Sequence, residues 1–151
     1  MDPGNIGLCI DVTTELTRRG RKKEADELFA PVSAIWDTVC KEFPQSAWAH
    51  NNAAWLAVRC QRDLDAALKH ARKGVELDPD NASYLGTLAE VHFQQGDKDK
   101  AVELMNKCIE MRPKHDYFRK QLKRMQAGDR KADVPPVATP YPAARSVLGI
   151  L

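Results

Sequence analysis

The strongest constraint on the fold of this chain is an internal repeat. Residues 63–67 (Asp-Leu-Asp-Ala-Ala) match residues 97–101 (Asp-Lys-Asp-Lys-Ala) at an offset of 34 residues, and the same offset brings Pro79 onto Pro113. A unit of this length is one pair of helices that cannot bury its apolar face alone, so neighbouring units must stack to make a continuous core. The repeat therefore predicts an all-α chain built from stacked antiparallel helical hairpins.

The apolar residues within each unit recur at helical spacing. In residues 80–113 an apolar first helix is followed by Gly96 and Asp97, where Gly96 is predicted to end one helix and Asp97 to cap the next. Pro79 and Pro113 end the second helix of each unit, because proline lacks a backbone donor. The positions expected to be buried are Leu85, Leu88, Ala89, Phe93, Ala101, Leu104, Met105, Cys108 and Ile109 in this unit, and Ala53, Ala54, Ala57, Leu64, Ala67, Leu68, Ala71 and Val75 in the unit before it.

Residues 46–113 resemble two tetratricopeptide repeats of the bacterial kind, at 46–79 and 80–113. The family pattern falls on Ala67 and Ala101, where the two helices of a hairpin cross closely. His92 departs from the pattern, because an aromatic residue is usual there. The resemblance implies a right-handed superhelical stack whose concave face, lined by the first helix of each repeat, binds a protein or peptide.

The N-terminal third fits the repeat loosely and is predicted to be a divergent repeat at about residues 5–45. Gly20 lies at the expected turn between its helices, and Ala25 lies at the expected helix crossing. The second helix must continue past Pro31 to reach Pro44, and an internal proline removes a backbone bond, so Pro31 is predicted to kink or split it. The expected apolar stripe consists of Ile6, Leu8, Ile10, Val12 and Leu16, and then Leu28, Val32, Ile35, Trp36 and Val39.

A capping helix is predicted at residues 114–127, after the last repeat. Stacked repeats leave the last one with an exposed apolar face, which a helix with a polar back can cover. The repeats and this cap together form the predicted domain at residues 1–128, followed by a proline-rich tail at residues 129–151, expected to be extended or disordered. The apolar side of the cap is Phe118, Leu122 and Met125, and its polar side is Arg119, Lys120, Lys123 and Arg124.

The composition is that of a soluble protein of one domain, with 151 residues and a net charge of +2. No run approaches the roughly 18 apolar residues of a membrane helix, and residues 1–4 lack the basic and apolar stretch of a secretory signal, so a cytoplasmic location is expected. The cysteines are Cys9, Cys40, Cys60 and Cys108. They show no zinc-binding spacing, so they are expected to be buried thiols in a reducing compartment.

The outward positions of the first helices are the candidate binding site, by the resemblance to the family. Tryptophan and arginine often dominate interface energies, and Asn51 or Asn52 could bond the backbone of an extended peptide. The alternative for Trp48 and Trp55 is packing between units. The candidate ligand-binding residues are Asn51, Asn52, Trp55 and Arg59 in the second unit, and Ser83, Gly86, Glu90 and Gln94 in the third.

The main alternative function is self-association through the capping helix or the apolar end of the tail. Catalysis, a cofactor and a metal site are not expected, because the four histidines are scattered and no acid pair, catalytic triad or phosphate-binding glycine loop is found. Nucleic-acid binding is not expected either. The basic cluster at residues 18–23 is flanked by acidic residues, and the cluster at 112–131 is explained by the capping helix.

Overall fold

A computed structural model describes residues 6–130 of the chain, and these residues form seven helices without a strand. The predicted proline-rich tail lies outside the described residues except for Asp129 and Arg130. None of the described helices is long and apolar enough to cross a membrane. The helices are α1 (Ile6–Arg18), α2 (Lys22–Glu42), α3 (Ala47–Cys60), α4 (Leu64–Leu77), α5 (Ala82–Gln95), α6 (Lys98–Met111) and α7 (Asp116–Ala127).

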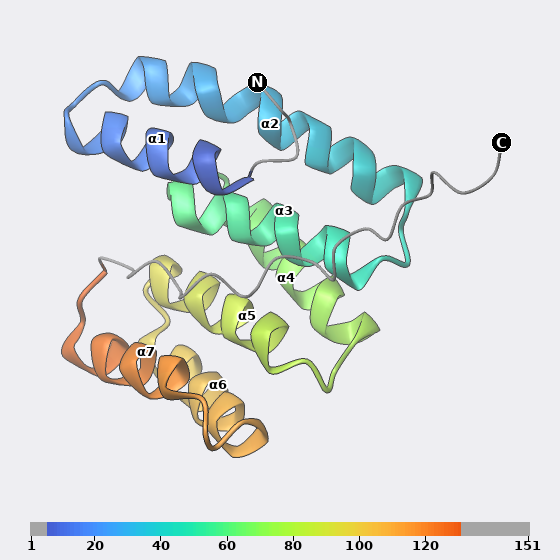
Figure 1. The fold of residues 1–151 in the computed structure, drawn as a ribbon, viewed down its shortest axis with the longest axis vertical. Helices are drawn as coiled ribbons and strands as arrows, with labels where there is room; N and C mark the ends of the chain where they lie inside the picture. The colour runs from blue at the N-terminus through green and yellow to red at the C-terminus, as the bar shows by residue number, and fades with distance from the viewer. Residues whose placement is uncertain (1–5, 131–151) are drawn as a thin grey trace, which may run out of the picture.

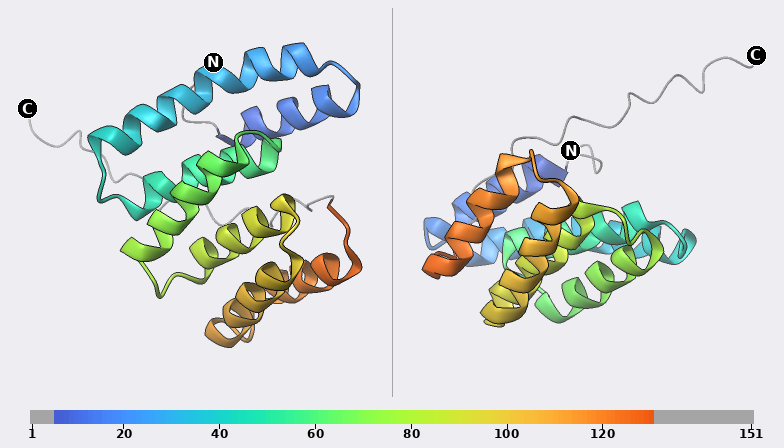
Figure 2. Two further views of the ribbon diagram at one scale, coloured as in Figure 1. Left: turned by 180° about the vertical axis from the view of Figure 1, so that it is seen from behind. Right: turned by 90° about the horizontal axis from the view of Figure 1, so that it is seen from below.

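The helices pair into consecutive hairpins, as the repeat predicts. Contacts join α1 with α2, α3 with α4, and α5 with α6, and α7 packs on α6. Neighbouring hairpins meet where α3 contacts α1, α2 and α5, and where α4 contacts α5. Figure 1 shows α1, α3, α5 and α7 on the side facing the viewer, and Figure 2 shows α2, α4 and α6 from behind. The prediction of an all-α stack of antiparallel hairpins is confirmed.

Local side-chain chemistry sets the helix ends. The side chains of Ser46 and Asp97 accept hydrogen bonds from backbone N–H groups in the first turns of α3 and α6, at 3.2 Å each. Gly96 ends α5 in the left-handed conformation with φ of 95°, as predicted. The turn between α3 and α4 is one residue longer than the turn between α5 and α6, and it holds two non-glycine residues at positive φ, Gln61 and Asp63.

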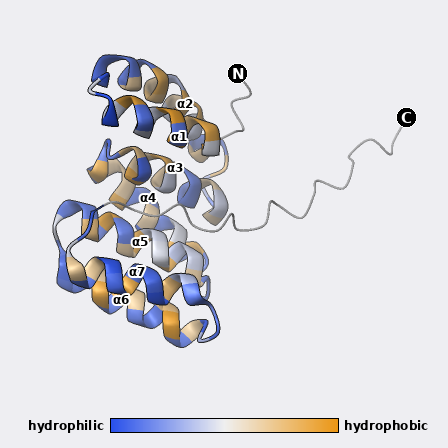
Figure 3. Cartoon of the chain, turned by 60° about the vertical axis from the view of Figure 1, so that its left-hand side comes forward, coloured by the Kyte–Doolittle hydropathy of each residue, from blue (hydrophilic) through white to orange (hydrophobic). Residues whose placement is uncertain are grey.

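Small residues sit where the two helices of each hairpin cross. Ala25, Ala67 and Ala101 are fully buried in α2, α4 and α6. Gly74 also lies close to its partner helix, since a Cβ added there would be 3.4 Å from the carbonyl oxygen of Ala47 in α3. Figure 3 shows hydrophobic and hydrophilic residues along each labelled helix, as expected for helices that bury one side.

The first two helices differ in part from the predictions. Pro31 lies inside α2, which continues as one helix of 21 residues, so the predicted split does not occur. In α1 the buried residues are Cys9, Ile10 and Thr13, so most of the predicted apolar residues of this helix are not buried. Leu8 and Val12 of α1 are exposed, and so is Ile35 of the predicted stripe on α2, at 36–45% of their surface. The apolar pattern of α1 has two-residue spacing, but a helix presents residues three or four apart on one side.

The four cysteines are buried free thiols, as predicted from their spacing. Burial raises the pKa of Cys60 and Cys108 to about 12, because a thiolate is poorly solvated in the core. The protonated Cys108 thiol of α6 donates a hydrogen bond to the carbonyl oxygen of Ala82 in α5, at 3.3 Å. The thiols of Cys60 and Cys108 therefore act as core side chains.

Candidate interaction surface

Helix α3 supplies half of the predicted binding residues. Trp55 is partly buried against the core, and the Arg59 guanidinium lies over its ring at 5.3 Å from the ring centroid. Asn51 and Asn52 are half-buried, and Asn51 Oδ1 and Asn52 Nδ2 are buried atoms without a hydrogen-bond partner among the described residues. Buried amide atoms without partners cost free energy, so these two atoms lower the stability of the fold locally.

Helix α5 carries the other four predicted binding residues, and neighbouring parts of the chain cover most of them. Ser83 is exposed, but a Cβ added to Gly86 would lie 3.3 Å from the ring of Phe118 in α7. Glu90 and Gln94 are buried, with 5% and 8% of their surface exposed. The prediction of outward-facing side chains at Glu90 and Gln94 is therefore corrected: both are enclosed by contacts with α7 and the segment after it.

A buried polar network joins α5 to α7. Arg124 forms an ion pair with Glu90, and both side chains are less than a tenth exposed. The same guanidinium donates to Gln121 Oε1 at 2.7 Å and lies 5.1 Å from the centroid of the Phe93 ring. Gln94 Nε2 donates to the other Glu90 oxygen at 2.7 Å. Arg124 was predicted to lie on the solvent side of the cap, and this is wrong.

The repeat contains a signal for this pair. Arg124 follows Glu90 by the repeat offset of 34 residues, and Trp55 precedes Glu90 by 35 because of the extra residue in the turn after α3. Equivalent positions of neighbouring first helices lie side by side in a repeat stack. Trp55, Glu90 and Arg124 therefore occupy equivalent positions of α3, α5 and α7, and we call these three residues the column. Treating α7 only as a cap hides this equivalence.

The chain turns back onto this column after α7. Gly128 ends the helix at a φ of 75°, and the next two residues return toward α5. Arg124 donates to the carbonyl oxygen of Asp129 at 2.9 Å, and Gln94 Nε2 donates to the carbonyl oxygen of Arg130 at 3.1 Å. Arg124 of the column and the neighbouring Gln94 thus hold two consecutive backbone carbonyls.

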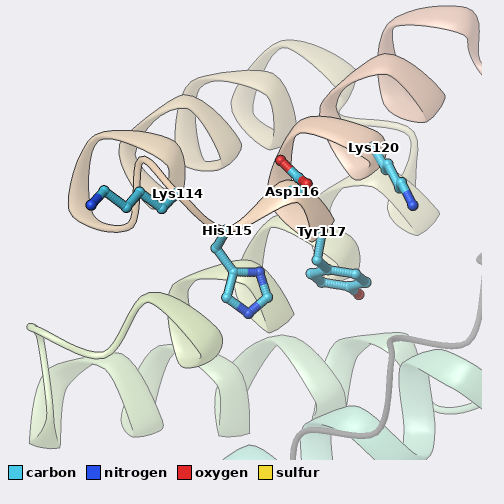
Figure 4. A pocket seen from close by; sticks show the side chains of 5 residues that line it. All are labelled: Lys114, His115, Asp116, Tyr117 and Lys120. Atoms are coloured by element: carbon cyan, nitrogen blue, oxygen red, sulfur yellow. The ribbon is translucent and has the colours of Figure 1, made fainter.

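Among the described residues, two shallow pockets contain none of the predicted binding residues. One of about 300 Å³ lies at the turn before α7, where the rings of His115 and Tyr117 point to the same side (Figure 4). The other, of about 290 Å³, lies on α1 and the turn after it. The first is lined by Lys114, His115, Asp116, Tyr117 and Lys120, and the second by Asp11, Val12, Glu15, Leu16, Arg19 and Arg21.

The basic cluster at residues 18–23 is paired with acidic side chains. Arg18 and Arg19 both bind Glu15, and Arg21 binds Glu24. The hydrogen bonds from Arg18 and Arg19 lower the pKa of Glu15 to about 2. Charges neutralised in this way give a weaker field than the sequence run indicates.

Stacked helical hairpins that repeat along the chain define an α-helical repeat protein. Residues 60–124 match the family model for the tetratricopeptide repeat. A stretch of 81 residues is 31% identical to sperm-associated antigen 1 of Mus musculus, covering 54% of this chain and 9% of that protein. Residues 60–124 therefore consist of tetratricopeptide repeats, as the family model describes them. Repeats of this family are protein-interaction modules, and whether this one is of the bacterial kind stays a prediction.

Proposed function

We propose that the column formed by Trp55, Glu90 and Arg124, with Gln94 beside it, binds an extended segment of a partner protein. The observation that carries the proposal is the pair of hydrogen bonds from Arg124 and Gln94 to the carbonyl oxygens of Asp129 and Arg130. Backbone carbonyls occur in every peptide, so side chains that hold two in a row suit an extended chain of varied sequence.

The neighbouring α3 residues extend this surface. Asn51 and Asn52 are half-buried amide side chains on α3, and a peptide backbone offers both donors and acceptors to amides. Trp55 supplies a large apolar surface with the Arg59 guanidinium over it, a combination common at interface hot spots. The bound segment is accordingly expected to extend from α7 and α5 toward α3. Because the four thiols need a reducing environment to stay free, we place this activity in the cytoplasm.

A peptide supplied as a separate molecule tests the proposal. The chain ending at Gly128 is titrated with a labelled peptide of residues 129–151, and binding is followed by fluorescence anisotropy. We expect saturable binding that falls about 3- to 10-fold in Gln94→Ala, the value of one net hydrogen bond. We expect a loss of tenfold or more in Trp55→Ala, if the ring acts as a hot spot.

Gln126→Ala is the matched control, because Gln126 is an exposed glutamine on α7. The full-length chain should bind the labelled peptide more weakly than the truncated chain, since its own residues 129 and 130 compete. The proposal fails if the truncated, folded chain does not bind the peptide, or if Gln94→Ala and Gln126→Ala bind it equally.

Self-association remains the alternative use of the same surface, in which the segment after α7 docks on a second copy. Light scattering of the full-length chain and of the chain ending at Gly128 separates the two ideas. Under the proposed function both chains have the mass of a monomer. A full-length chain heavier than a monomer, together with a monomeric truncated chain, would favour the alternative.

A further inference from the structure

Three metal-binding side chains from three helices meet at the junction of the first two hairpins. Cys40 lies near the end of α2, His50 near the start of α3, and His70 in the middle of α4. The Cys40 Sγ and one ring nitrogen from each histidine all lie within 4.8 Å of one another. Cys40 and His50 are buried and His70 is half-buried, so solvent reaches the cluster from the His70 side.

The neighbours of the two histidines bear on which nitrogen of each ring carries a proton. The Nδ1 atoms of His50 and His70 lie 2.9 Å apart. His50 Nε2 lies 3.1 Å from the carbonyl oxygen of Pro44, and His70 Nε2 lies 3.6 Å from Asp37 Oδ1. Because both oxygens are acceptors, they favour a proton on each Nε2, and two Nδ1 lone pairs that face each other in this way can hold a cation between them. Without a cation, a proton on one Nδ1 joins the two rings by a hydrogen bond.

We propose that Cys40, His50 and His70 bind a zinc ion. One thiolate and two imidazoles are ligands that zinc prefers, whereas magnesium and calcium prefer oxygen. Pro44 and Asp37 complete the arrangement, since ligating histidines usually donate their second N–H to a carbonyl or carboxylate. A tetrahedral zinc site separates ligand atoms by roughly 3.3–3.6 Å, so the cluster closes around the ion with side-chain movements of about 1 Å.

Zinc binding has two consequences for the chain. The Cys40 thiol must lose its proton to the solvent as the zinc–sulfur bond forms, so each bound ion releases one proton. The three protein ligands leave a fourth position for water. The ion would also join α2, α3 and α4, and so lock the N-terminal hairpin onto the next one. The sequence hides the site because residues 40, 50 and 70 are far apart along the chain.

The test uses the full-length chain with zinc or cobalt as the probe. We expect one zinc ion per chain in competition with a chromophoric chelator, release of one proton, and a thermal midpoint that rises with zinc concentration. Cobalt(II) should give thiolate-to-metal charge-transfer absorption and the intense visible bands of a tetrahedral site. Asp37→Asn should weaken zinc binding by about 10- to 100-fold, as expected for loss of an outer-shell partner.

Cys40→Ser and His70→Gln should abolish both stoichiometric zinc binding and the cobalt charge-transfer band, while the exposed His115→Gln keeps them. If these variants do not fold, the wild-type cobalt spectrum still shows whether a thiolate binds the metal, and Asp37→Asn still tests whether the ion lies in this cluster. The proposal is overturned if the folded wild-type chain takes up no stoichiometric zinc or gives no such band. In that case a proton shared by His50 and His70 holds the rings together.

Discussion

Replacing Arg124 by alanine should lower the free energy of unfolding by about 3–5 kcal/mol, the largest single effect we expect in this chain. The substitution leaves the Glu90 carboxylate buried between α5 and α7 without its cation. It also removes the donors to Gln121 and to the carbonyl oxygen of Asp129. Urea unfolding followed by circular dichroism measures the change, with a lower midpoint at similar slope expected.

Lys123→Ala is the matched control, because Lys123 is the exposed neighbour of Arg124 on the same helix. It should change the free energy of unfolding by less than about 0.5 kcal/mol. The double variant Glu90→Leu, Arg124→Met should recover much of the loss, since apolar residues of similar volume can replace a buried ion pair. A single Arg124→Ala change as mild as the control would show that the pair does not hold α7 in place.

Replacing Ala67 by leucine should lower the free energy of unfolding by about 1–3 kcal/mol or more, because the added carbons have no space. Ala67 is completely buried in α4 at its crossing with α3. The close approach of Gly74 to the α3 backbone, about two turns further along, leaves the two helices little room to separate. The same urea measurement applies.

Ala66→Leu separates packing from helix propensity. Ala66 is the exposed neighbour of Ala67, and leucine is nearly as good a helix former as alanine. We expect this variant to be within about 0.5 kcal/mol of the wild-type chain. Equal effects of Ala66→Leu and Ala67→Leu would contradict the close helix crossing.

The second half of the fold could be predicted from sequence because its signals are local. The helix from Ala82 ends at Gly96 and the next is capped by Asp97, as their residue types indicate. The stripe of Leu85, Leu88 and Ala89 is buried. The N-terminal hairpin was predicted less well, because α1 mixes two spacings and α2 tolerates Pro31 inside one continuous helix.

The candidate site could be predicted only as a set of positions. The resemblance named positions on α3 and α5, but the accessibility of those side chains depends on what α7 and the following residues cover. Glu90 and Gln94 are buried because Arg124 and Arg130 approach them across more than 30 residues of chain. Such pairings have no local pattern, and a basic residue on a polar helix face usually points to solvent.

The sequence by itself determined the helices, their order and the stacking of hairpins, since the 34-residue repeat and the caps act within a few turns of the chain. Only the tertiary structure decided which polar groups meet. It brings Glu90 to Arg124, and it brings Cys40 to His50 and His70, through the packing of separate helices. The physical reason is one of range: helix formation and capping depend on neighbours in sequence, whereas an ion pair or a ligand cluster depends on distances in space.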